Sequence, residues 1–203
     1  MIGIVQYGTG NVHAVVRALE RCGVTPMVVN RPEEIERCDK VIFPGVGHFK
    51  NAMDQLNKEG WIPFLKDFAL VKRKPFLGIC LGMQLLSNES EEGNISGLGF
   101  IEGRVVKMLN DGEVKIKIPH MGWNQLHSMN GNFLSKVTQE DFFYFTHSYH
   151  WENVQDENIL CKTKYGKDII TGVIKNNIIG VQFHPEKSYE SGKKVLESFI
   201  QLM

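Results

Sequence analysis

The sequence is poor in cysteine, and no spacing pattern joins the cysteines that it has. Four cysteines occur among 203 residues, without a Cys-x-x-Cys pair and in separate, mostly apolar stretches. This pattern argues against both a disulfide scaffold and a tetrahedral zinc site, so we expect no metal and no cofactor. We expect Cys22, Cys38 and Cys161 to act as small buried hydrophobes.

An excess of one charge and long apolar runs are also missing. Lys+Arg and Asp+Glu number 23 each, which predicts no broad surface for nucleic acid or for an anionic membrane. No segment approaches the run of about 18 apolar residues that a membrane span needs. Residues 1–11 contain neither the basic region nor the long apolar region of a signal peptide. We therefore expect a soluble, cytoplasmic protein without nucleic-acid or membrane partners.

The chain contains no repeat, linker or low-complexity tract, and its length suits one domain, residues 1–203. In the first half, short apolar segments alternate with helical patterns. We expect strands over 2–5, 27–29, 41–43 and 76–79, and helices that start at residue 12, cover 32–38, and cover 49–70 with a break near Gly60 and Pro63. This alternation predicts an α/β fold with a parallel sheet covered on both faces.

The second half has a different pattern. It predicts strands joined by turns at 110–112 and 175–177, in an antiparallel or mixed arrangement, over 100–118, 142–149, 159–165, 168–174 and 178–183. A final amphipathic helix over 190–202 should turn five apolar side chains toward the core: Val195, Leu196, Phe199, Ile200 and Leu202.

The strongest local signal for chemistry surrounds Cys80. Gly78-Ile-Cys80-Leu-Gly82 joins an apolar strand to a helical segment, which is the pattern of a nucleophile elbow with cysteine in the place of serine. The two glycines allow a sharp turn, and the start of a helix favours the thiolate. A buried cysteine in a glycine-rich turn is the alternative interpretation.

A base and an orienting acid follow 104 residues after Cys80, at His184-Pro-Glu186. Proline favours an extended conformation for the residue before it. If the segment is extended, His184 and Glu186 point to the same side. Glu186 can then hold the imidazole of His184 in one tautomer while its other nitrogen faces the thiol, as in a Cys–His–acid triad.

The sequence resembles the class I (triad) glutamine amidotransferases, and more narrowly the glutaminase subunits of imidazole glycerol phosphate synthases. The resemblance covers the whole chain and rests on the two catalytic segments, Gly78–Gln84 and Gln182–Ser188, and on four further motifs. These motifs are Tyr7-Gly-Thr-Gly-Asn11, Phe43-Pro-Gly-Val-Gly-His-Phe49, Pro119-His-Met-Gly-Trp-Asn124 and Tyr144-Phe-Thr-His-Ser-Tyr149. It implies a flavodoxin-like single domain with a mostly parallel central sheet.

The resemblance implies a role for each matching residue. Cys80 is the nucleophile, His184 the base and Glu186 its partner, and glutamine is hydrolysed to glutamate and ammonia through a cysteine thioester. The oxyanion is expected near the backbone of Gly45, Val46, Gly47 and Leu81. Glutamine is expected to be held by Gln84, Ser148 and Tyr149.

The resemblance also implies a partner, a (β/α)8 cyclase subunit that forms a heterodimer with this chain. The partner would use the ammonia to make imidazole glycerol phosphate and AICAR in histidine biosynthesis. Its interface and the ammonia path are expected at His120, Met121, Trp123, Asn124 and Tyr144. Aromatic residues are enriched in such interfaces, although a core tryptophan is the alternative for Trp123.

Two departures from the family pattern keep a second pathway open. The first turn begins with Gln6 where the family usually has Asp. Residues 88–103 keep the Glu-Ser and Gly-Leu-Gly elements of the family but differ from its pattern between them. A paralogue that supplies ammonia to a sugar-amidating enzyme in surface-polysaccharide synthesis would have the same chemistry. Other classes to separate are a cysteine peptidase, a stress protein with the same elbow, and a non-enzymatic phosphate-binding module. The 7–11 turn lacks the spacing of the last class.

Overall fold

A computed structural model describes residues 1–110 and 115–202. The first half contains four strands in the order that the sequence predicts: β1 (Ile2–Val5), β2 (Met27–Val29), β3 (Lys40–Gly45) and β4 (Phe76–Cys80). Helical segments connect them: α1 (Val12–Arg21), the 3₁₀ helix η1 (Pro32–Arg37), α2 (Phe49–Lys58), α3 (Trp61–Lys66), the π-helical segment η2 (Asp67–Val71) and α4 (Leu81–Gln84). Gly60, in a left-handed conformation, separates α2 from α3, which confirms the expected break.

The second half contains mostly strands: β5 (Glu89–Ser90), β6 (Ile95–Ser96), β7 (Arg104–Lys107), β8 (His120–Gln125), β9 (Phe142–His147), β10 (Tyr149–Glu152), β11 (Ile159–Tyr165), β12 (Lys167–Lys175) and β13 (Ile178–Val181). The 3₁₀ helices η3 (Asp156–Asn158) and η4 (Pro185–Lys187) and the helix α5 (Tyr189–Gln201) complete it. Among the described residues, no helix combines the length and the apolar character required to cross a membrane.

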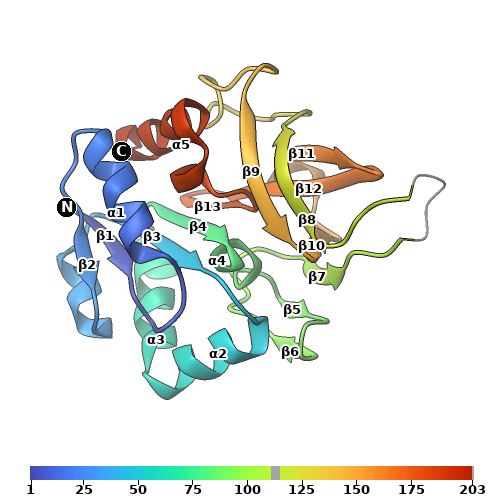
Figure 1. The fold of residues 1–203 in the computed structure, drawn as a ribbon. Helices are drawn as coiled ribbons and strands as arrows, with labels where there is room; N and C mark the ends of the chain where they lie inside the picture. Colours follow the sequence, from blue (N-terminus) through green and yellow to red (C-terminus); the bar gives the residue numbers. More distant parts are fainter. Residues whose placement is uncertain (111–114, 203) are drawn as a thin grey trace.

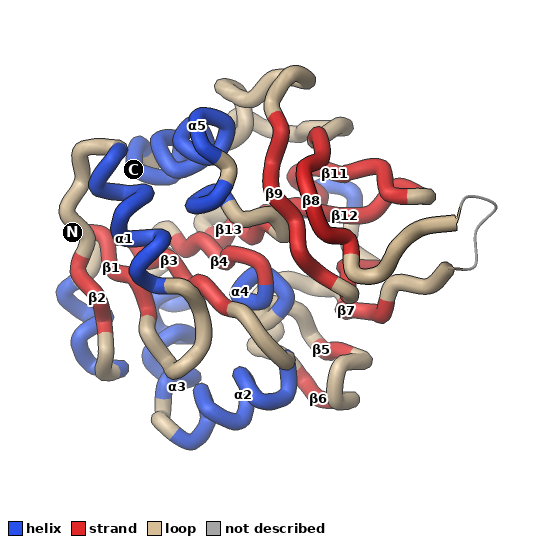
Figure 2. Tube along the Cα trace, viewed as in Figure 1, coloured by secondary structure: helices blue, strands red, loops and turns tan. Residues whose placement is uncertain are grey.

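The main sheet has a parallel part and a largely antiparallel part. Its order is β2-β1-β3-β4-β13-β12-β10-β7-β5-β6, with β11 on β12. The contacts from β2 to β13 are all parallel, whereas β12 pairs antiparallel with β13, β11 and β10. A separate two-stranded sheet joins β8 to β9 (Figure 2). This α/β architecture confirms the fold expected from the sequence.

Helices cover both faces of the parallel strands (Figure 1). On one face α1 and α5 pack through side chains such as Val15 and Phe199 against Ile4 and Ile79. On the other face α2 and α3 pack through Phe49 and Trp61 against Phe43. Because both faces are covered, β1, β4 and β13 are buried along their whole length and consist of nearly continuous apolar runs.

Several expectations for the second half were wrong in detail. Of the strand expected over 100–118, only Arg104–Lys107 forms β7, and residues 111–114, with most of the turn expected at 110–112, lie outside the described residues. Strand β8 coincides with one of the motifs but was not expected as a strand. Ile200 and Leu202 are half-buried and pack against the core, in the direction expected. Cys38 and Cys161 are buried as expected, but Cys22 is partly exposed.

A buried carboxylate ties the start of β9 to α5, beside the segment that carries His184. Asp141 accepts hydrogen bonds from the backbone and hydroxyl of Thr138, from Ser191 Oγ (2.8 Å) and from Lys194 Nζ (2.7 Å). Burial alone would raise the pKa of Asp141, but the bonds to Lys194, Thr138 and Ser191 outweigh it and lower the pKa. The carboxylate is therefore the form that the fold stabilises.

Replacing Asp141 with alanine should lower the free energy of unfolding by about 2–4 kcal/mol, because it leaves buried donors without their acceptor. Lys194→Ala should cost less, since the Lys194 side chain is 35% exposed and the carboxylate keeps its other donors. The folded pKa is depressed, so this stabilisation is present above the unfolded pKa of about 4 and is lost as the pH falls through the folded pKa. Urea denaturation at neutral and acidic pH measures both effects. Equal losses for the two variants would contradict this account.

Candidate active site

Cys80 stands on a strained turn between β4 and α4. Cys80 is the last residue of β4. Its backbone angles, φ 54° and ψ −109°, lie in a region that residues other than glycine rarely adopt. Such strain persists only where the surrounding structure imposes it. The following helix starts at once with Leu81, so the sulfur stands at the N-terminus of α4. The backbone therefore has the elbow that the sequence predicts.

The glycines that flank Cys80 are required by contacts. A Cβ atom on Gly82 would lie 1.8 Å from the carbonyl oxygen of Phe43, and one on Gly78 would lie 2.7 Å from the carbonyl oxygen of Gly82. Helix α4 thus lies directly on the backbone of β3 and β4. This contact holds Cys80 opposite Gly45, its partner in the β3–β4 register.

His184 and Glu186 form a buried pair next to Cys80. His184 Nδ1 lies 2.7 Å from Glu186 Oε1; since a carboxylate accepts, Nδ1 carries the hydrogen and Nε2 is the nitrogen left for the thiol. His184 Nε2 has no hydrogen-bond partner among the described residues. The backbone N–H of His184 donates to the carbonyl of Tyr144, which ties the pair to β9.

The expected route to this pairing was wrong, although the pairing itself is present. An extended segment was expected to turn both side chains to one side. His184 is extended, with φ −102° and ψ 92°, but Pro185–Lys187 forms the 3₁₀ helix η4, which folds Glu186 back onto the imidazole. Proline is well suited to the first position of such a turn because its φ is already near the helical value.

The environment of His184 favours its protonated form. Burial lowers the pKa of His184, but the interaction with Cys80, followed by that with Glu186, outweighs burial and raises the pKa to about 10. An imidazolium beside the sulfur stabilises a thiolate, which is the nucleophilic form of cysteine.

One cavity joins most of the residues singled out from the sequence. It has a volume of about 330 Å³, and Cys80 and His184 both line it. The other lining residues are Val46, Gly47, Leu81, Gln84, Glu92, Pro119, Thr146, His147, Ser148 and Tyr149. Of the expected oxyanion group only Gly45 is absent from the wall, because it is buried in β3 beside Cys80. The three expected glutamine ligands line the cavity together.

The segment after β3 presents unpaired backbone donors near Cys80. The N–H groups of Val46 and Gly47 make no hydrogen bond to any described residue. Gly47 has a φ of 111°, which favours glycine. Free backbone N–H groups at the wall of this cavity are the kind of donor that can stabilise an oxyanion.

Two residues at this site, Gln182 and Glu92, were not expected from the sequence. Gln182 Nε2 donates to Cys80 Sγ (3.6 Å), and Gln182 Oε1 accepts from Gln84 Nε2 (2.9 Å). Gln182 follows directly after β13, and its contact with Cys80 comes from a segment about 100 residues away in sequence, so no local pattern indicated it. Glu92 accepts from the backbone N–H of Phe49 (2.7 Å). Its loop gave no sequence signal.

The β8–β9 sheet divides the expected partner residues between its two faces. Met121 and Trp123 lie on the outer face and are 63% and 48% exposed, next to Tyr189, which is 78% exposed. Trp123 stacks on Tyr189 (5.6 Å between ring centroids) and meets Tyr144 edge-on (5.9 Å). We call Met121, Trp123, Tyr144 and Tyr189 the aromatic face. This face is available to a partner.

His120 and Asn124 lie on the inner face, so they do not share this exposure. His120 is 2% exposed and stacks between the rings of Phe145 and Tyr165. Its Nδ1 lies 2.9 Å from His147 Nε2, and Asn124 Nδ2 lies 3.3 Å from its Nε2. Burial lowers the pKa of His120 to about 4, so the ring is neutral. His120 is thus enclosed by this chain, and its expected place at the partner interface or on the ammonia path stays a prediction.

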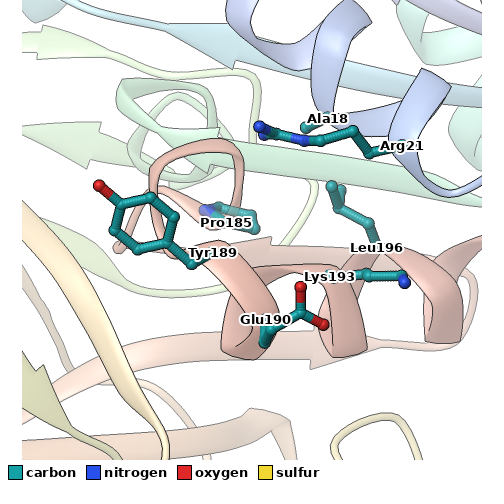
Figure 3. A pocket seen from close by; sticks show the side chains of 7 residues that line it. All are labelled: Ala18, Arg21, Pro185, Tyr189, Glu190, Lys193 and Leu196. Atoms are coloured by element: carbon teal, nitrogen blue, oxygen red, sulfur yellow. The ribbon is translucent and has the colours of Figure 1, made fainter.

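A second cavity lies between the end of α1 and the start of α5 (Figure 3). It has a volume of about 310 Å³ and is lined by Ala18, Arg21, Pro185, Tyr189, Glu190, Lys193 and Leu196. Its lining contains no pair of nucleophile and base, so the Cys80 cavity is the better candidate for catalysis. Among the residues that the structure describes, no cluster of three or more His, Cys, Asp or Glu side chains is placed to hold a metal.

Comparison with known proteins gives likenesses over the full chain. A family model described as glutamine amidotransferase class-I matches residues 4–202. A Methanococcus maripaludis protein named imidazole glycerol phosphate synthase subunit HisH 2 is 44% identical and covers 99% of each chain. A Campylobacter jejuni protein named subunit HisH 1 of that synthase is 43% identical and covers 100% of each. A crystal structure of a glutamine amidotransferase shares the fold, with a TM-score of 0.76 at 17% identity, covering 98% of this chain and 97% of that one.

The interaction between Cys80 and His184 should appear in the pH dependence of stability. The pKa of His184 is raised to about 10 in the folded state, against about 6.5 in an unfolded chain. A raised pKa contributes stability that is complete below the unfolded value and is lost as the pH rises through the folded value. Between pH 7 and pH 10 the wild type should therefore lose about 1–3 kcal/mol more stability than Cys80→Ala, in which the thiolate is absent.

Urea denaturation at a series of pH values measures this difference. Titrations of groups other than Cys80 and His184 are common to both proteins and cancel, so the difference reports the Cys80–His184 pair as a unit. Nuclear magnetic resonance of the His184 ring is an independent control. The ring should remain protonated at pH 8 in the wild type, and its pKa should be lower in Cys80→Ala. Parallel stability curves together with an unchanged ring titration would show that Cys80 and His184 are not coupled.

Proposed function

The chain belongs to the class-I glutamine amidotransferase family, and we propose that it is the glutaminase subunit of an imidazole glycerol phosphate synthase. The observation that carries the proposal is one cavity holding an elbow cysteine and a buried His–Glu pair, in a chain that matches relatives of that name from end to end. The proposal treats residues 1–203 as one catalytic domain.

The reaction begins with the thiolate of Cys80. The sulfur attacks the side-chain amide carbon of glutamine, and the oxyanion that forms is held by backbone N–H groups of the Gly45–Gly47 segment and of Leu81. His184, held by Glu186, gives a proton to the leaving nitrogen, so ammonia departs and a γ-glutamyl thioester remains. Water, deprotonated by His184, then attacks the thioester and releases glutamate.

The rest of glutamine carries an ammonium and a carboxylate, and the cavity wall offers groups for both. Gln84 Nε2 is occupied by the carbonyl of Tyr149 (3.2 Å) and by Gln182, so Gln84 Oε1 remains to accept from the ammonium. Glu92 supplies a carboxylate at the same wall. The backbone and hydroxyl of Ser148 and the backbone of Tyr149 are suited to the substrate carboxylate.

The ammonia goes to a (β/α)8 cyclase subunit that forms a heterodimer with this chain and makes imidazole glycerol phosphate and AICAR. Exposed aromatic residues are typical of the core of an interface, and the aromatic face adjoins β9, which also borders the cavity at Thr146 and His147. The proposal places the protein in the cytoplasm, because a nucleophilic thiol stays reduced there.

Substitutions in the triad should separate the roles of its members. Cys80→Ala should abolish glutamate release with circular dichroism unchanged, and His184→Ala should be nearly as damaging. Glu186→Gln should retain about 10- to 100-fold more activity than His184→Ala. The reason is that Glu186 orients His184 but does not itself exchange protons with the substrate. The Cys80→Ala, His184→Ala double variant should be no worse than Cys80→Ala. Activity near that of wild type in Cys80→Ala would refute the mechanism.

Docking of the partner should control the rate. The isolated chain should release glutamate slowly, and the partner carrying its acceptor substrate should raise the rate by about 10²–10³-fold, which is the value of one oxyanion donor. The physical reason is that the Pro44–Gly47 segment can aim an N–H at the oxyanion in only one of two peptide orientations, and binding shifts the population through its differential affinity. Glutamate release is measured for the chain alone, with the partner, and with the partner and acceptor. A full rate in the isolated chain would identify a free-standing glutaminase.

A further inference from the structure

The Gln182 carboxamide lies between the nucleophile and two residues of the cavity wall. Its Nε2 donates to Cys80 Sγ at 3.6 Å, and its Oε1 accepts from Gln84 Nε2 at 2.9 Å. Gln84 Nε2 also donates to the carbonyl oxygen of Tyr149 at 3.2 Å. These bonds form a continuous chain from the substrate side of the cavity to the sulfur atom.

The orientation of the Gln182 amide follows from this chain. A backbone carbonyl only accepts, so the Gln84 atom that faces Tyr149 is the NH₂ group. The same NH₂ group faces Gln182, so the Gln182 atom opposite it must be the oxygen. The Gln182 nitrogen is then the atom directed at Cys80. The opposite orientation would set two donors against each other and would place an oxygen beside a thiolate.

A buried N–H donor acts more strongly on a thiolate than on the neutral forms of sulfur. Gln182 is fully buried, so no water competes for its amide. Hydrogen bonds to an ionised acceptor are shorter and stronger than bonds between neutral groups. The donor therefore favours the anionic sulfur over both the thiol and the thioester.

We propose that Gln182 is a catalytic residue of the glutaminase reaction, whose carboxamide N–H stabilises the Cys80 thiolate at the start and at the end of each cycle. This inference rests on the function proposed above. In acylation the sulfur electron pair forms the C–S bond, the C–N bond breaks and ammonia leaves, so the thiolate charge at Gln182 disappears. In deacylation water attacks the thioester carbon, the C–S bond breaks and its electron pair returns to sulfur. The Gln182 N–H then donates its hydrogen bond to the thiolate that has formed again.

The fixed chain has a second effect on the substrate side. Because Gln182 Oε1 holds one hydrogen of Gln84, the Gln84 carboxamide is kept with its oxygen toward the cavity. Gln182 thus acts on the sulfur directly and on the glutamine subsite through Gln84. Removing it should lower kcat through the first effect and raise KM modestly through the second.

The test compares wild type with Gln182→Met, which keeps the length of the side chain and removes both polar ends. Cys80 is alkylated with iodoacetamide over a pH series, and its modification is followed by mass spectrometry of the Cys80 peptide, because Cys22 is also accessible. At neutral pH the variant should react about tenfold more slowly, and this deficit should disappear at high pH, where a thiolate without the Gln182 hydrogen bond is at least as nucleophilic as that of the wild type. With glutamine, kcat should fall about 10- to 100-fold.

Thr163→Val is the matched control. Thr163 is buried in β11 and does not line the cavity. Its replacement by valine removes one side-chain hydrogen bond, that between Thr163 Oγ1 and Thr171 Oγ1 at 2.9 Å. Its alkylation profile should coincide with that of wild type. If Gln182→Met does not fold by circular dichroism, Gln182→Asn replaces it, because the shorter side chain withdraws the N–H from the sulfur.

The outcomes are distinguishable. A fall in glutamine turnover with an unchanged alkylation profile of Cys80 would overturn the proposal, since Gln182 would then act only through packing. The proposal would equally fail if Thr163→Val shifted the profile as much as Gln182→Met. A shifted profile in Gln182→Met alone supports the interaction, even if neither protein hydrolyses glutamine. That last result would count against the proposed function and not against the role of Gln182 at the thiolate.

Discussion

The parallel register of β3, β4 and β13 sets the geometry of the whole site. Gly45 pairs with Cys80 across β3 and β4, and Ile79 pairs with Val181 across β4 and β13. Cys80, the Gly45–Gly47 segment and His184 therefore leave the sheet at the same edge, where ligand sites in parallel sheets are found. A slip of one residue would turn every side chain of a strand to the opposite face. Packing of α1, α5, α2 and α3 on both faces prevents that slip.

Burial strengthens the electrostatic interactions between the charged groups of the site and also disfavours their charged forms. His184 and Glu186 are almost completely removed from water, so their desolvation must be offset by close contacts. Those contacts are the 2.7 Å bond between them, the bond of the His184 N–H to Tyr144, and the bond from Ser188 Oγ, which donates to the His184 carbonyl at 2.7 Å. The backbone of His184 is thus held on both sides, and the bond to Glu186 fixes the orientation of its ring.

The sequence was sufficient for the parallel half and for the turn that carries Cys80, because both depend on local patterns. Continuous apolar strands and the Gly78-Ile-Cys80-Leu-Gly82 turn are visible without tertiary information. The position of Glu186 was found with a wrong conformation, since the tightness of η4 is decided by packing around Pro185. Strand β8 was missed because its Pro-His-Met-Gly-Trp-Asn start resembles a loop, and it becomes a strand by pairing with β9. Contacts between distant segments, such as Gln182 with Gln84 or Glu92 with Phe49, leave no local trace.

The aromatic face has a consequence for how the protein is produced. Met121, Trp123 and Tyr189 expose apolar surface on one side of the molecule, and such patches tend to self-associate when nothing covers them. A chain whose aromatic face stays uncovered would carry a permanent tendency to aggregate. The recombinant yield of the isolated chain should therefore respond to polar substitutions on the aromatic face before it responds to changes in the core.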